Sequence, residues 1–146
     1  MEHRFLGQTS LNVSRLGLGL AALGRPGYIN LGHGKDLHSL DKTAMEKQAH
    51  NILNAAYQHG LRYFDTARSY GNAEAFLASW LGSHEPYDVV VGSKWGYIYT
   101  ADWQVQADKH EIKEHSRENL EHQFSESISL LGSYLSLYQI HSATLE

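Results

Sequence analysis

The sequence predicts an α/β fold with a parallel sheet, and three observations support this expectation. Three segments repeat apolar residues with the period of an α-helix. Four short apolar runs separate and follow them, in the order strand, helix, strand, helix, strand, helix, strand. These runs lack a regular alternation of apolar and polar residues, which is typical of strands covered on both faces. Such an order indicates consecutive βαβ units, and the 146 residues fit one domain, placed at 1–146.

The strands are expected after an N-terminal hairpin, in which two short apolar runs of "HRFLGQTSLNVS" flank the turn "GQTS". The four buried strands are "RLGLGL" at 15–20, "RYFDTA" at 62–67, "DVVVGSKW" at 88–95 and "YLSLYQIHS" at 134–142.

Each predicted helix is followed by a glycine, the residue that commonly ends a helix. The apolar faces are Ala49, Ile52, Leu53, Ala56 and Tyr57 before Gly60; Ala73, Phe76, Leu77, Trp80 and Leu81 before Gly82; and Leu120, Phe124, Ser127, Ile128 and Leu131 before Gly132. Thr43 and Glu46 have the spacing of a capping box at the start of the first helix. Two long segments, 24–41 and 96–115, stay unassigned; both follow a strand and precede a helix, where α/β folds build their sites.

Composition excludes several classes of function. The formal charge of −4 gives no footprint for nucleic acid, and no stretch approaches the roughly 18 apolar residues of a membrane span. Cysteine is absent, so disulfides and thiolate metal sites are excluded. We expect a soluble, cytoplasmic protein without a metal site, because His110, His115 and His122 lack metal-ligand spacing. "LGHGKD" at 31–36 lacks the spacing of a phosphate-binding loop and is expected to be surface loop.

Polar or small residues stand at the carboxyl ends of the four strands: Gly19, Asp65, Lys94 and His141. In a parallel sheet these positions meet at one rim, together with Tyr70 from the loop after the second strand. An ammonium beside a phenol stabilises the phenolate, so Lys94 would lower the pKa of Tyr70 and Asp65 would orient Lys94. His141 could hydrogen-bond the oxygen that Tyr70 protonates. The group predicts an acid for a carbonyl oxygen, which is useful when a nicotinamide supplies hydride.

The stretches "YFDTARSYG", "VVVGSKWG" and "LYQIHS", preceded by "RLGLGL", resemble the aldo-keto reductases over nearly the whole chain. The resemblance implies a (β/α) barrel of the TIM type that reduces a small aldehyde or ketone with NADPH, or less often NADH. It implies a catalytic tetrad of Asp65, Tyr70, Lys94 and His141, with cofactor contacts at Gly19, Asp65 and His141. Leu20 and Ala21 replace the threonine and tryptophan often found after the first strand.

Only the first half of such a barrel is present, about four strands and three helices, because a complete one needs about 250 residues. In that family, most of the residues that bind the cofactor belong to the half of the barrel that is absent here. The open sheet would have two unpaired edges. Three explanations stay open: a fragment or domain of a longer protein, a homodimer that completes the barrel, and a truncated relic.

The alternatives to this function are plainer. The chain could be a non-catalytic binding or regulatory module on the same fold. Taken one at a time, each tetrad residue also has a structural interpretation. Asp65 could cap the start of a helix from the loop before it, and Lys94 could be a solvated surface lysine. Tyr70 could be a packed aromatic residue, and His141 could be a core histidine bonded to a backbone carbonyl. The aromatic residues of the second long segment could line a substrate pocket or pack beneath a loop; they are Trp95, Tyr97, Tyr99 and Trp103.

Overall fold

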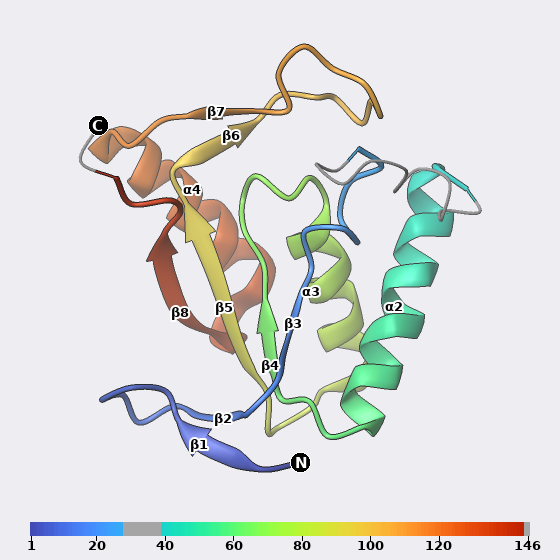
Figure 1. Ribbon diagram of the computed structural model, residues 1–146, viewed down its shortest axis with the longest axis vertical. Coiled ribbons are helices and arrows are strands. Elements are labelled where there is room, and N and C mark those ends of the chain that lie inside the picture. The colour runs from blue at the N-terminus through green and yellow to red at the C-terminus, as the bar shows by residue number, and fades with distance from the viewer. Residues whose placement is uncertain (28–38, 145–146) are drawn as a thin grey trace.

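A four-stranded parallel sheet forms the centre of the computed structural model, which describes residues 1–27 and 39–144 (Figure 1). Its strands lie in the order β3 (Gly17–Gly19), β4 (Tyr63–Asp65), β5 (Val90–Trp95) and β8 (Leu135–Ile140). All three neighbouring pairs are parallel. The predicted order of four parallel strands is therefore confirmed. The expectation that all four are buried is wrong for β3 and β8, which form the two edges and are exposed or half-buried.

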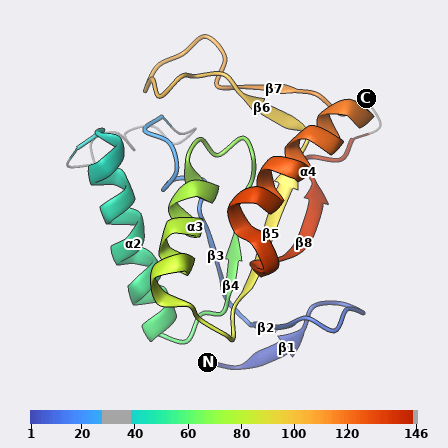
Figure 2. The same cartoon turned by 180° about the vertical axis from the view of Figure 1, so that it is seen from behind.

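Helices cover one face of this sheet (Figures 1 and 2). They are α2 (Lys42–Gln58), α3 (Ala73–His84) and α4 (Arg117–Leu131), the last followed by a short 3₁₀ helix, η1 (Gly132–Tyr134). Phe64 of β4 packs edge-on against Trp80 of α3, with ring centroids 5.6 Å apart, at the centre of the core. On the opposite face a Cβ at Gly17 or Gly92 would come within 2.8 Å of the Tyr63 side chain, so this ring lies across both glycines.

Two antiparallel hairpins lie at opposite ends of the sheet (Figure 1). The predicted N-terminal hairpin is present as β1 (His3–Phe5) and β2 (Asn12–Ser14). The second hairpin, β6 (Tyr97–Tyr99) with β7 (Glu111–Lys113), lies beyond the carboxyl end of β5 and occupies the segment that the sequence left unassigned. The other unassigned segment is described only in part, and "LGHGKD" lies outside the described residues.

Helix ends agree with the sequence at two of three places. Gly60 follows α2 with φ +86° and Gly132 ends α4 with φ +55°, as predicted. The prediction for α3 was wrong, because this helix passes Gly82 and ends at His84. His84 stacks on Trp80 and its Nδ1 lies 2.9 Å from the Trp80 carbonyl oxygen, which holds the extra turn.

The start of α2 also differs from expectation. Asp41, rather than Thr43, caps the helix, since its carboxylate accepts a 3.1 Å hydrogen bond from the backbone N–H of Ala44. An aspartate at this position satisfies one of the free N–H groups of the first turn.

The buried stripe of α4 is largely polar, which corrects the predicted apolar face. It consists of Asn119, Gln123, Ser127 and Leu131. Gln123 accepts a 2.9 Å hydrogen bond from the Gly96 N–H and donates one of 2.9 Å to the Tyr97 carbonyl, so it fastens the turn between β5 and β6. Phe124 and Ile128 remain 44% and 41% exposed.

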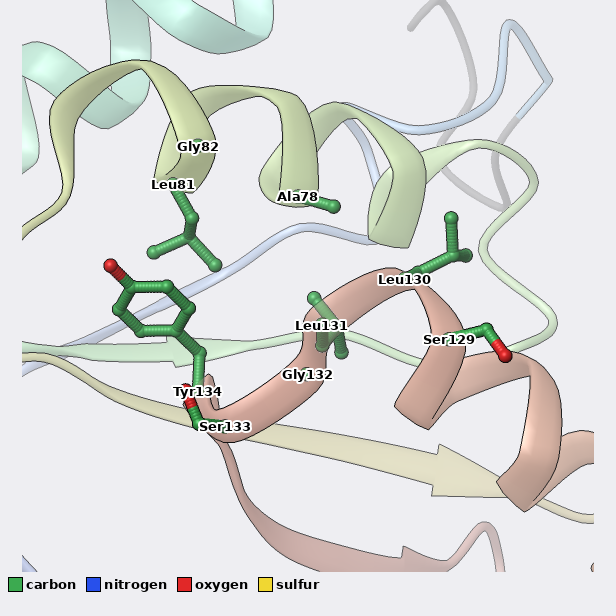
Figure 3. Close-up of a pocket in the computed structure, with 9 residues that line it drawn as sticks. All are labelled: Ala78, Leu81, Gly82, Ser129, Leu130, Leu131, Gly132, Ser133 and Tyr134. Carbon is green, nitrogen blue, oxygen red and sulfur yellow. The ribbon is translucent and has the colours of Figure 1, made fainter.

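An open pocket of about 240 Å³ lies between the carboxyl ends of α3 and α4 (Figure 3). Ala78 and Leu81 line it from α3, and Leu130 and Tyr134 line it from the other side. Because the helices run back along the sheet, this pocket lies at the opposite end from the carboxyl ends of the strands.

None of the helices in the described parts of the chain has the length and apolar character needed to cross a bilayer.

Candidate active site

A carboxylate and an ammonium meet at the carboxyl ends of β4 and β5. The Lys94 Nζ lies 2.5 Å from Oδ2 of Asp65 and donates a 3.0 Å hydrogen bond to the Thr66 carbonyl. The two side chains are 15% and 27% exposed, respectively. Residues on neighbouring strands alternate faces together, so Asp65 and Lys94 both project from the face opposite α2, α3 and α4. Lys94 is therefore paired, and the reading of it as a solvated lysine does not fit.

The loop after β4 carries Tyr70 and is fastened to its surroundings along its length. Arg68 N–H donates to the carbonyl of Lys94 at 3.0 Å, and Asn72 N–H donates to that of Gly24 at 2.7 Å. Gly24 must lack a side chain, because a Cβ there would lie 2.2 Å from the Tyr70 carbonyl oxygen. Gly71 has φ +61°, which favours glycine and lets the chain turn into α3. The position of Tyr70 is thus set by backbone contacts on both sides.

The side chains of the four predicted tetrad residues come together at this rim. The Nζ of Lys94 lies 5.2 Å from the centroid of the Tyr70 ring. The His141 ring meets the Tyr70 ring edge-on, at 5.5 Å between centroids and 87° between planes. Asp65 joins the group through Lys94. Four residues separated by up to 76 positions in the chain therefore surround one point above the sheet.

Gly19 lies at the edge of this group. It pairs with Asp65 across β3 and β4, and a Cβ at Gly19 would meet no atom within 4 Å. The space above the end of β3 is therefore open and borders the carboxylate of Asp65.

His141 is half-buried, with the cations of Lys94 and Arg25 and the carboxylates of Glu111 and Asp65 around it. Burial lowers its pKa below the ordinary 6.5, and the nearby cation of Lys94 lowers it further. Its ring Nδ1 lies 3.3 Å from the hydroxyl of Ser69. The reading of His141 as a core histidine bonded to a backbone carbonyl does not fit this ring contact.

Sequence reasoning missed a buried guanidinium beside the tetrad. Arg25, only 2% exposed, donates 3.1 Å hydrogen bonds to the Ser69 carbonyl and to a carboxylate oxygen of Glu111. Its Cζ lies 5.8 Å from the centroid of the Tyr70 ring. Arg25 belongs to the first unassigned segment and Glu111 to the second, so no local pattern could pair them. The sequence offered one indication: both residues lie in segments that follow a strand and precede a helix, and α/β folds build their sites from such segments.

The aromatic residues of the second segment divide between the two readings left open above. Tyr97 borders the rim, with its ring centroid 5.1 Å from that of His141. Trp103 instead packs against Phe76 of α3 and donates a 2.7 Å hydrogen bond to the Leu40 carbonyl. Tyr97 is thus placed to contact a ligand, whereas Trp103 holds the β6–β7 hairpin to the helices.

The rim fits the nicotinamide end of a dinucleotide better than its phosphate end. The open space over Gly19 and the polar groups of Asp65 and His141 suit a carboxamide-bearing ring. Both cations beside Tyr70 pair with carboxylates of the chain, Lys94 with Asp65 and Arg25 with Glu111. Neither is therefore well placed to neutralise a phosphate.

Comparison with known proteins gives a consistent set of relatives. The chain is 26% identical to the uncharacterized oxidoreductase YqkF of Bacillus subtilis (strain 168), covering 100% of this chain and 40% of that protein. It is 34% identical to the pyridoxal 4-dehydrogenase of Microbacterium luteolum, over 68% of this chain and 25% of that enzyme. A solved structure from Pseudomonas aeruginosa, assigned to the aldo-keto reductases, superposes with a TM-score of 0.71 at 26% identity, covering 98% of this chain and 48% of that one.

The chain thus spans less than half the length of each of these relatives, and it matches their barrel fold as a partial barrel of four strands. The family model described as "Aldo/keto reductase family" matches residues 15–144, from just before β3 to the end of the described chain. This chain belongs to the aldo-keto reductase family.

Proposed function

We propose that this chain supplies the proton-transfer site of an oxidoreductase that reduces a small aldehyde or ketone to an alcohol. The observation that carries the proposal is the meeting of Asp65, Tyr70, Lys94 and His141 at one rim of the sheet. The oxidoreductases among its relatives support the general class of reaction.

Each residue has a role that follows from its chemistry. Tyr70 donates its phenolic proton to the carbonyl oxygen as the bond to hydrogen forms at carbon. Lys94 places a positive charge beside the phenol and so favours the phenolate that remains, while Asp65 keeps Lys94 charged and oriented. His141 donates a hydrogen bond to the same carbonyl oxygen and orients the substrate.

The cofactor we propose is NADPH, with NADH as the alternative. When bound, its reduced nicotinamide would supply the hydride. Gly19, Asp65 and His141 would hold the nicotinamide end, because they border the open space above β3. The phosphates would be held by the other half of the barrel, since the cations next to Tyr70 are already paired.

The reaction requires a second half-barrel, because the sheet face that bears the tetrad has no cover of its own. Closure would pair β8 with the first strand of that half and bring a helix beside α4, whose flank toward β8 exposes Phe124 and Ile128. A second copy of this chain would instead bring the exposed side of α2, which carries polar residues such as Lys47, Asn51 and Gln58. We therefore propose that the partner is a C-terminal half-barrel whose first helix is apolar. A homodimer is the alternative, and the mass of the assembly measured by light scattering would distinguish the two.

A second candidate function is a non-catalytic binding or regulatory module on the same fold. The observation that favours it is that Lys94 and Arg25, the cations beside Tyr70 in the described part of the chain, pair with carboxylates rather than facing a phosphate. Such a module would bind a nicotinamide or a partner without turnover.

The test is Tyr70→Phe in the complete barrel that contains this chain, with NADPH consumption followed in the presence of an aldehyde. Loss of the general acid should lower kcat roughly a hundredfold or more. Tyr138→Phe is the matched control, because the Tyr138 hydroxyl lies 3.3 Å from the Ser127 hydroxyl of α4 and Tyr138 is outside the tetrad.

Unchanged turnover in Tyr70→Phe would contradict the assigned role. Absence of NADPH-dependent turnover from the unaltered complete barrel, with cofactor binding retained, would favour the non-catalytic module.

A further inference from the structure

His141 is held at three points, two of them on its backbone. Its N–H donates to the Trp95 carbonyl at 2.8 Å, as the last step of the pairing between β5 and β8. Its carbonyl lies 3.1 Å from Nε2 of His115, and because a carbonyl can only accept, that Nε2 carries a proton. The third point is the contact between the ring Nδ1 and the Ser69 hydroxyl, at 3.3 Å. Backbone and ring are thus fixed by different segments of the chain.

Ser69 is built into the structure rather than free to move. It is 1% exposed and directly precedes Tyr70 in the loop after β4. Its carbonyl accepts a 3.1 Å hydrogen bond from Arg25, which in turn is paired with Glu111 of β7. A hydroxyl held this way has a defined position toward the His141 ring.

The direction of the Ser69 contact decides what the ring can do. A neutral imidazole carries one proton, on either Nδ1 or Nε2. If the Ser69 hydroxyl donates to Nδ1, the proton lies on Nε2 and can be given to a substrate oxygen. Burial, followed by the cation of Lys94, lowers the pKa of His141, and the carboxylates of Glu111 and Asp65 offset this only in part; the neutral ring, in which this choice matters, is therefore favoured.

We propose that Ser69 is a positioning residue that donates its hydroxyl proton to Nδ1 of His141 and thereby keeps His141 in the Nε2–H form, aimed at the substrate carbonyl. Arg25 supports it by holding the Ser69 backbone. The direction of the hydrogen bond and its catalytic consequence rest on the proposed function, whereas the contact between Ser69 and His141 does not.

The test combines a spectrum with kinetics. Long-range ¹H–¹⁵N spectra of the histidine rings, assigned with His141→Gln, should show His141 protonated on Nε2. Ser69→Ala should shift these signals toward a mixture of the two tautomers. It should also lower kcat in the complete barrel about fivefold to tenfold, the factor that corresponds to one net hydrogen bond, while the KM for the cofactor stays constant.

Ser127→Ala is the matched control, since Ser127 is equally buried but donates to Glu74 and has no contact with His141. It should lower stability yet leave the His141 signals in place. A proton on Nδ1 in the unaltered protein, or His141 signals that do not change in Ser69→Ala, would overturn the proposal. If the tautomer changes but Tyr70→Phe has no effect on turnover, the proposed function fails and the Ser69 contact stands.

Discussion

Two tyrosines of the same strand and loop, Tyr63 and Tyr70, lie in different electrostatic surroundings. Burial raises the pKa of Tyr63, and the carboxylate of Asp65 raises it further, so Tyr63 is a neutral phenol within the sheet face. Tyr70 instead has the ammonium of Lys94 at 5.2 Å and the guanidinium of Arg25 at 5.8 Å from its ring. Two tyrosines seven positions apart thus differ in their neighbours, a carboxylate beside Tyr63 and two cations beside Tyr70.

The charge state of His141 gives a prediction in pH. Its pKa is lowered in the folded chain by burial and by Lys94, whereas the unfolded chain protonates it near 6.5. Between these two values the unfolded state binds more protons, so the stability due to this group is complete above pH 6.5 and is lost as the pH falls below it. Urea unfolding from neutral pH downward should show this loss, and His141→Gln should remove that part of the slope. An identical pH dependence in both proteins would rule out the assigned shift.

At the scale of residues, the sequence predicted the positions of Asp65, Lys94 and His141 because each lies at or next to the end of a strand, and strand ends are readable from a short apolar run. Tyr70 was predicted from the loop that follows such an end. The contacts of Ser69, Arg25 and His115 could not be predicted. Each depends on a partner more than 25 positions away, and none has a spacing that marks it.

At the scale of elements, a buried polar network joins α3, α4 and β5. Glu74, 2% exposed, accepts hydrogen bonds from Ser93 at 2.5 Å and Ser127 at 2.7 Å, and it pairs with Arg68. The Tyr138 hydroxyl lies 3.3 Å from Ser127, and burial raises the pKa of Tyr138 to about 12, so it remains a neutral phenol. This network explains why the buried stripe of α4 is polar where the periodicity predicted apolar contacts.

Glu74→Gln should therefore destabilise the fold strongly, by about 3 kcal/mol, because it removes the buried one of the two carboxylates that pair with Arg68. Glu126→Gln removes the other carboxylate on Arg68, which is 40% exposed, and should change the free energy of unfolding by less than about 1 kcal/mol. Urea denaturation of both variants measures the difference. Equal small changes would mean that the network contributes little.

Element types were predictable here, whereas some element ends were not. The helical period and the glycines located α2 and α4, but α3 continues beyond Gly82 through a stacking contact between Trp80 and His84. The β6–β7 hairpin escaped prediction because its three-residue strands are too short to show a period.

At the scale of the whole molecule, several exposed apolar side chains lie at the β8 edge, where a second half-barrel would pair. The edge strand β8 ends in Ile140, which is 52% exposed, and Phe124 of α4 lies over Tyr138 of the same strand. Leu130 is as exposed as Ile128, at 41%, yet it lines the pocket toward α3 (Figure 3). Ile128→Lys should therefore weaken association with a second half, and Leu130→Lys should not.

The most direct measurement is NADPH-dependent aldehyde reduction in fractions resolved by size exclusion with light scattering, for the 146-residue chain alone and after mixing with a C-terminal half-barrel. Because no helix of the described residues covers the tetrad and the cations described beside it are paired, turnover should be absent from the monomer and appear only in a closed assembly. It should decrease with Ile128→Lys and disappear with Tyr70→Phe. Turnover by the monomer, or turnover that survives Tyr70→Phe, would contradict the assignment of the chain as half of a tyrosine-dependent reductase.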